Sequence, residues 1–199
     1  MPEQKQLNPF YTQERWHNWI SKVKDSGFKI DDQQKGAVFV YMEDDLVLAC
    51  LKIIAKYDKN VISQEDALKY LAEIKEVVLK KIEPINEDID MMIESVQLSL
   101  IGVFASCECY LEKAFEKTKS LDKLIKSAVE AEKEDNMGAA LNSIAQIGAN
   151  ILAGGKIKEK HLDDIPEGLV GEWLDGIDSI SAAMVGDTSY RDDEPDEGD

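Results

Sequence analysis

The sequence predicts an all-α protein, a single globular bundle of about seven helices around two buried helices. Apolar residues recur at intervals of three and four along most of the chain, which is the period of an amphipathic helix. Two segments, 38–55 and 96–107, are apolar on nearly every side, as expected of helices that are packed all round. The only β-like run, VFVYM at 38–42, lies inside a longer helical pattern, so no strand is expected.

Residues typical of helix ends place the seven helices. Ser, Thr, Asn and Asp favour the N-cap, Pro the first turn, and Gly the position after the last turn. In chain order the helices are expected from Thr12 to Gly27, from Asp31 or Asp32 to about Tyr57, from Ser63 to Pro84, from Asn86 to near Lys117, from Ser120 to Asp135, from Asn136 to Leu152, and from Pro166 to Met184.

The apolar stripes predict how these helices pack. We expect the first helix, with Trp16 and Trp19, and the last, with Trp173, to close over the two buried helices. The fifth and sixth helices are expected to form an antiparallel hairpin. Its facing positions carry small residues: Ala128, Ala131, Ala140, Ala145 and Gly148.

The length of 199 residues suits one domain, expected over residues 12–185. Residues 1–11 are expected to be a flexible N-terminal arm. Residues 186–199 hold seven acidic residues, one Arg and no apolar stripe, so they are expected to be a disordered acidic tail.

The charge balance bears on the partners. Forty acidic residues against 23 basic ones give a net charge of −17, which repels a phosphate backbone. Direct nucleic-acid binding is therefore not expected. A surface of this sign favours basic partners or divalent cations, or serves solubility alone.

The compartment is predicted to be the cytoplasm. The N-terminus, MPEQKQLNPFY, lacks the features of a secretory signal, and the longest apolar run is shorter than the ~18 residues of a membrane span. An odd number of cysteines, three, agrees with a reducing compartment.

Motifs for nucleophilic catalysis or cofactor binding are absent from the sequence. It has no Gly-x-Ser-x-Gly elbow, phosphate loop or dinucleotide fingerprint. Cys107 and Cys109 point about 200° apart on a helix, which favours burial over zinc binding. No cofactor is expected.

Three successive acidic residues, Glu43, Asp44 and Asp45, interrupt an otherwise buried helix. A buried carboxylate without a partner is unfavourable, so these side chains must reach solvent, a lysine, a backbone N–H or a cation. We expect a solvated helix edge, with a functional acidic pocket as the alternative.

Glu14 and His17 have the Glu-x-x-His spacing of di-iron bundles, but a second such pair is missing. The metal-ligand candidates are Glu14, His17, Asp44, Asp45, Glu94 and Glu108.

Two Trp-bearing stretches, PFYTQERWHNWI at 9–20 and GLVGEWLDGIDSISAAM at 168–184, carry a family resemblance. With YMEDDLVLACLKII and SVQLSLIGVF, they resemble an archaeal family of cytoplasmic proteins known only as a domain of unknown function. The resemblance spans about residues 9–185. It implies one domain in an archaeal cytoplasm and transfers no catalytic residue.

The function predicted from the sequence is a non-enzymatic protein-interaction module with an acidic surface and a basic protein partner. Trp16, Trp19 and Trp173 are the candidate partner-binding residues. The alternative is a metal-binding carboxylate/histidine helical-bundle enzyme. A third hypothesis is homo-oligomerisation through the aromatic first helix.

Overall fold

The computed structural model describes residues 9–117, 119–158, 161–162 and 165–186. In these residues it has seven α-helices, one short 3-10 helix and no strand, which confirms the all-α prediction. The elements are α1 (Gln13–Asp25), η1 (Gln33–Gly36), α2 (Ala37–Asp58), α3 (Gln64–Val78), α4 (Glu87–Leu111), α5 (Leu121–Lys133), α6 (Met137–Leu152) and α7 (Leu169–Val185). Most of the predicted N-terminal arm and acidic tail lies outside the described residues.

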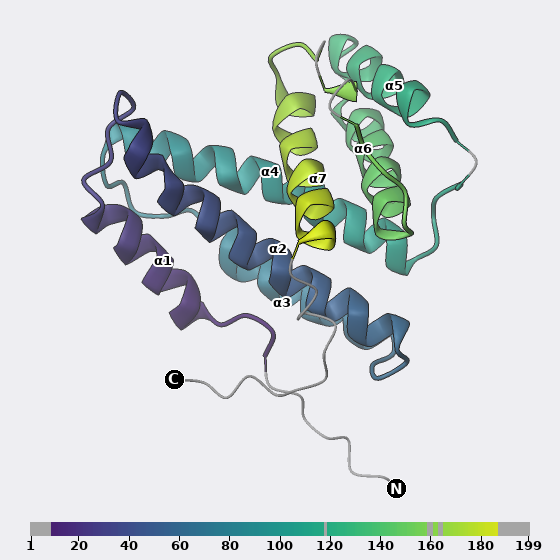
Figure 1. The fold of residues 1–199 in the computed structure, drawn as a ribbon, viewed down its shortest axis with the longest axis horizontal. Helices are drawn as coiled ribbons and strands as arrows, with labels where there is room; N and C mark the ends of the chain where they lie inside the picture. Colours follow the sequence, from purple (N-terminus) through teal and green to yellow (C-terminus); the bar gives the residue numbers. More distant parts are fainter. Residues whose placement is uncertain (1–8, 118, 159–160, 163–164, 187–199) are drawn as a thin grey trace, which may run out of the picture.

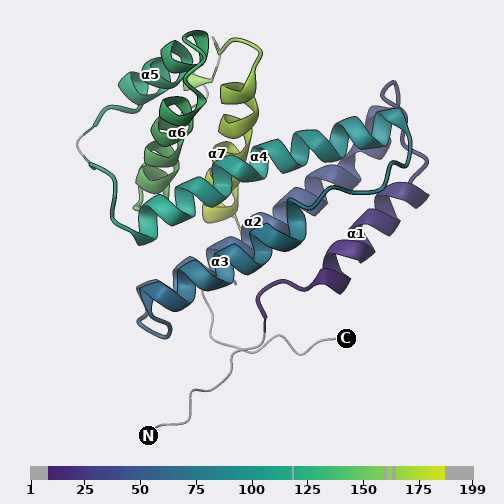
Figure 2. The ribbon, with the colours of Figure 1, turned by 180° about the vertical axis from the view of Figure 1, so that it is seen from behind.

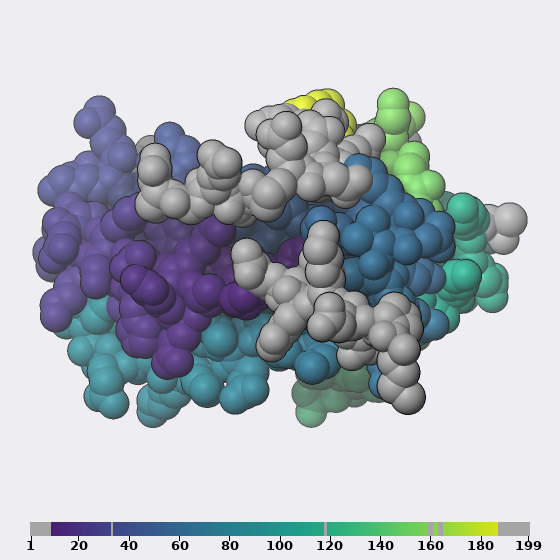
Figure 3. Space-filling model, turned by 90° about the horizontal axis from the view of Figure 1, so that it is seen from below, coloured from purple at the N-terminus to yellow at the C-terminus, as the bar shows by residue number. Residues whose placement is uncertain are grey.

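Helix α4 organises the bundle, because it packs against α2, α3, α6 and α7 (Figures 1 and 2). Helices α5, α6 and α7 gather around the C-terminal half of α4, and α7 crosses α4 steeply. At the other end, α1 lies along α2. In the view from below, α1 in purple and α3 in blue share the lower face (Figure 3).

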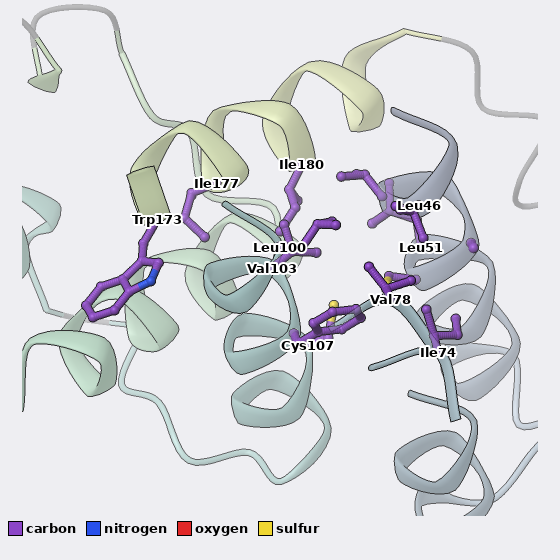
Figure 4. Close-up of a cluster of buried hydrophobic side chains, with 14 of the residues drawn as sticks. Leu46, Leu51, Ile74, Val78, Leu100, Val103, Cys107, Trp173, Ile177 and Ile180 are labelled. Atoms are coloured by element: carbon purple, nitrogen blue, oxygen red, sulfur yellow. The ribbon is translucent and has the colours of Figure 1, made fainter. Parts of the chain in front are cut away.

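The two helices predicted to be buried contribute most to the core. Figure 4 shows Leu46 and Leu51 of α2, Leu100 and Val103 of α4, and Ile180 of α7 in one cluster of buried side chains. Large side chains of both helices, such as those of Phe39 and Phe104, are fully buried, and their burial is the main force that holds the bundle together.

The outer side of α4 departs from the prediction, because Leu98 and Ile101 are only half-buried. This helix is the one, among the described residues, that is long and apolar enough to cross a membrane. Half of its apolar window is buried inside the protein.

Four helix boundaries differ from the prediction. The second helix opens with the 3-10 turn η1, and α3 ends at Val78, before Pro84. Helix α7 starts at Leu169, after Gly168, and Pro166 precedes it. Helix α4 ends at Leu111, because Lys113 adopts a left-handed conformation that lets the Ala114 N–H bond back to the Cys109 carbonyl.

Small residues set the spacing of α4, α6 and α7. A Cβ added at Gly102 of α4 would lie 2.7 Å from the Trp173 carbonyl oxygen, and one added at Gly176 of α7 would lie 2.4 Å from that of Ser99. Gly148 of α6 contacts Ser106 of α4, so its predicted place facing α5 was wrong. Ala145 likewise packs with Cys109 of α4. The backbones of these helices therefore approach each other at points where a larger residue has no room.

Candidate functional site

The three successive acidic residues of α2 point in different directions. Neighbouring residues of an α-helix are rotated by about 100°. Asp45 therefore faces α1, Glu43 faces α4 and α7, and Asp44 lies between them, half-exposed.

Asp45 holds α1 on α2. Its carboxylate accepts two hydrogen bonds from the Arg15 guanidinium and one of 2.7 Å from the Trp19 indole N–H. The guanidinium carbon of Arg15 also lies 5.5 Å from the centre of the Tyr11 ring. Burial, and then the negative charge of Asp45, raise the pKa of Tyr11. Asp45 therefore has a structural role that its position in the sequence did not reveal.

Glu43 lies where α2, α4 and α7 meet. One of its carboxylate oxygens accepts hydrogen bonds from the hydroxyls of Ser99, at 2.6 Å, and Ser179, at 3.1 Å. Burial raises the pKa of Glu43 and the two serine hydrogen bonds oppose this rise, while the charges of Asp175 and Asp44 add to it. Of the three residues in this hydrogen-bonded cluster, Glu43, Ser99 and Ser179, only Glu43 was singled out in the sequence.

Further carboxylates continue this charge along α7. Glu172 accepts a hydrogen bond of 2.7 Å from Ser95 of α4. Burial, and then the charges of Glu172 and Asp178, raise the pKa of Asp175. Burial also raises the pKa of Asp44. We call the five carboxylates Glu43, Asp44, Glu172, Asp175 and Asp178 the acidic face. No lysine or arginine in the described ranges forms an ion pair with any of them.

Exposed apolar side chains adjoin the acidic face. Val40 is 57% exposed and Tyr41 62% exposed, although both stand in the core helix α2. They precede Asp44 by four and three residues, so they share its side of the helix. The surface here combines negative charge with an aromatic ring and an aliphatic group, a combination suited to a side chain that is both apolar and cationic.

The six metal-ligand candidates are spread over α1, α2 and α4. Glu14, His17 and Glu94 are exposed. Asp45 is bound by Arg15, and Glu108 forms an ion pair of 3.0 Å with Lys75. In the part of the chain that the structure describes, no group of three or more His, Cys, Asp or Glu is arranged to hold a metal ion.

The three tryptophans predicted to bind a partner belong largely to the interior. Trp16 is 4% exposed and Trp173 5% exposed. Trp19 is half-buried, with Asp45 accepting from its indole N–H. Trp16 and Trp173 therefore present little surface to a partner, whereas part of Trp19 is accessible.

The cysteines are also interior residues. The thiols of Cys50 on α2 and Cys107 on α4 adjoin each other, and both are fully buried. The hydrogen bond to Cys50, followed by burial, raises the pKa of Cys107, and burial raises the pKa of Cys109 to about 11. Such thiols are unreactive, in keeping with their predicted structural role.

A separate hollow of about 310 Å³ lies beside α5. His161 forms part of its wall: the ring Nδ1 accepts from the Lys158 N–H, and Nε2 lies 3.4 Å from an Asp122 carboxylate oxygen. The lining also includes three further charged residues of α5, two Lys and one Glu, and an apolar floor: Lys126, Glu130, Lys133, Ile125, Val129 and Ile165. Because both charges are present in equal number, the hollow favours no single class of ligand.

The chain matches over residues 9–193 the family described as "Uncharacterized protein conserved in archaea (DUF2150)". The chain belongs to this family. The match confirms the resemblance inferred from the Trp-bearing stretches, and it spans every helix of the described structure. No curated protein and no solved structure matches the chain. A functional assignment for this DUF2150 member therefore has to come from its own residues.

Proposed function

We propose that this DUF2150 member is a non-enzymatic helical module that binds a basic protein segment through the acidic face and the adjoining Val40 and Tyr41. The observation behind the proposal is a row of carboxylates that form no ion pair with any residue the structure describes, beside exposed apolar side chains. We also propose the cytoplasm as its compartment, where three buried free thiols would persist.

The electrostatics of the acidic face support a cationic partner. The raised pKa values of Glu43, Asp44 and Asp175 mean that each ionised carboxylate is held in unfavourable surroundings at neutral pH. A cation bound nearby would relieve part of the mutual repulsion. The net charge of −17 would also accelerate the approach of a basic partner at low salt.

The apolar residues support a protein segment over a simple metal cation. A hydrated divalent cation gains nothing from Val40 or Tyr41. An amphipathic helix with Lys or Arg beside Leu or Ile can cover these side chains and pair with the carboxylates at the same time. The proposed occupant is therefore a basic amphipathic segment.

The test uses a fluorescent helical peptide in which Leu alternates with Lys and Arg at helical spacing. Its affinity for the full chain is measured by anisotropy at about 50 mM and about 300 mM salt. The variant with Asp175→Asn and Asp178→Asn is compared with a control, Glu73→Gln and Glu112→Gln, which removes the same charge from exposed positions elsewhere.

We expect the Asp175/Asp178 variant to bind at least about fivefold more weakly than the Glu73/Glu112 control, which reflects one or two lost charge contacts. Equal weakening in both variants would show that net charge alone attracts the peptide, and the site would be refuted. Absence of binding by the unmodified chain at low salt would refute the function.

A further inference from the structure

Arg15 shows how this protein holds an arginine. Its guanidinium makes two hydrogen bonds to Asp45 and lies 5.5 Å from the centre of the Tyr11 ring. The cation thus binds a carboxylate and lies over an aromatic ring at the same time. Arg suits this geometry better than Lys, because its donors form a fixed fork and its plane stacks on rings.

A second pairing of an aromatic ring with a carboxylate lies on α2 and faces solvent. Tyr41 and Asp44 are three residues apart on α2, a spacing that places side chains about 5–6 Å apart at Cβ. Tyr41 is 62% exposed, and Asp44 forms no ion pair with any described residue. A guanidinium is wide enough to contact both groups at once.

Tyr110 and Tyr70 also lie beside carboxylates, but the hydroxyl of one and the ring of the other are already in contact with a neighbour. The hydroxyl of Tyr110 donates to Asp58 at 3.0 Å, and the ring of Tyr70 packs edge-on against Phe10. Asp66, one turn before Tyr70, accepts from the hydroxyl of Ser63. Tyr41 with Asp44 therefore differs from these pairs in presenting both its ring and its carboxylate to a partner.

We propose that Tyr41 and Asp44 together bind an arginine side chain of the basic partner, with the guanidinium over the Tyr41 ring and paired to the Asp44 carboxylate. This inference rests on the proposed function and makes it more specific, because it requires an arginine-bearing segment. Val40 adjoins the pair and contacts the aliphatic part of the arginine or an apolar neighbour in the same segment.

The experiment compares two helical peptides of identical sequence, except that every cation is Arg in one and Lys in the other. Affinities for the full chain and for three variants, Tyr41→Leu, Tyr41→Phe and Asp44→Asn, are measured by anisotropy at about 50 mM salt. Circular dichroism confirms that each variant is folded. Tyr41→Phe is the matched control, because it keeps the ring and removes only the hydroxyl.

We expect the unmodified chain and Tyr41→Phe to prefer the Arg peptide by about fivefold, the size of an exposed guanidinium–ring contact together with a forked ion pair. Tyr41→Leu and Asp44→Asn should reduce this preference to less than about twofold. Equal affinity of the unmodified chain for both peptides overturns the arginine inference and leaves the proposed function standing. If neither peptide binds, the proposed function itself fails.

Discussion

Gly148 of α6 lies directly against Ser106 of α4. A Cβ built on Gly148 would come within 2.0 Å of the Ser106 hydroxyl oxygen, and that hydroxyl donates to the Gly102 carbonyl at 2.7 Å. Neither partner can move away without breaking the contact between α4 and α6. Glycine is thus required here for space, although its backbone conformation is helical.

Gly148→Ala should therefore destabilise the protein by about 1–3 kcal/mol, the usual effect of overpacking. Gly138→Ala, in the same helix, is the matched control, because a Cβ there meets nothing closer than 3.9 Å. The control should be neutral or stabilising by up to about 1 kcal/mol, since Ala favours a helix more than Gly. Urea denaturation measures both changes, and equal effects would contradict the close α4–α6 contact.

Asp45→Asn should loosen α1. The substitution keeps the shape of the side chain, removes its charge and weakens its hydrogen bonds to Arg15 and Trp19. We expect a loss of about 1–3 kcal/mol in the free energy of unfolding and a changed near-UV signal from Trp19. Glu130→Gln breaks the exposed Lys126–Glu130 pair on α5 and should cost less than about 1 kcal/mol. A spectrum unchanged by Asp45→Asn would contradict the role of Asp45 in holding α1.

Glu43→Gln should change how stability depends on pH. The pKa of Glu43 is raised above its ordinary value of 4.5, so the folded state binds its proton more tightly than the unfolded state does. The stabilisation from that proton is complete below pH 4.5 and is lost as the pH rises through the raised pKa. The unmodified protein should therefore gain stability relative to Glu43→Gln as the pH falls from about 7 to about 4.

Urea denaturation at several pH values measures this difference. Glu94→Gln, at an exposed position of α4, gives the effect of removing one surface charge and is subtracted. If the unmodified protein did not gain stability relative to Glu43→Gln as the pH falls, the buried position of the Glu43 carboxylate would be contradicted.

Ser63→Ala and Ser120→Ala make the same change at two helix N-caps. The Ser63 hydroxyl oxygen accepts from the Asp66 N–H at 3.0 Å, whereas the Ser120 side chain makes no cap hydrogen bond. Ser63→Ala should destabilise by about 1 kcal/mol and Ser120→Ala by less than about 0.5 kcal/mol. Thermal or urea unfolding compares the two variants, and the reverse order would be inconsistent with the α3 cap.

The three cysteines should resist alkylation in the folded protein. Cys50 and Cys107 are inaccessible, and the pKa of about 11 for Cys109 leaves little thiolate at about pH 8. Mass spectrometry after iodoacetamide treatment should find unmodified native protein, and threefold modification after unfolding in guanidinium. Rapid labelling of Cys50 or Cys107 in the native state would show that the α2–α4 contact opens readily.

Local sequence signals predicted most of the secondary structure. Thr12, Ser63, Asn86 and Asn136 were all expected near helix starts, and their side chains accept the capping hydrogen bonds. Such signals act within one helical turn, so they can be read from a few neighbouring residues. The error at the end of α4 arose because the left-handed conformation of Lys113, unusual for a lysine, decides where that helix stops.

The candidate site was predicted only in outline. The sequence marked Glu43, Asp44 and Asp45 as anomalous within a buried helix, but it could not say which carboxylate meets which neighbour. That depends on Arg15, Ser99 and other residues far away in the chain, which only the packing of whole helices brings together.

By itself the sequence determined that the protein is a helical bundle built around α2 and α4. The period of an apolar stripe indicates a helix, and its breadth indicates how much of that helix other elements must cover. Tertiary structure alone decided that Glu43 meets Ser179, 136 residues away, and that Trp16 and Trp173 are enclosed. Contacts of this kind follow from which helix faces meet and how closely small residues let them approach, and neither property is encoded within a single turn.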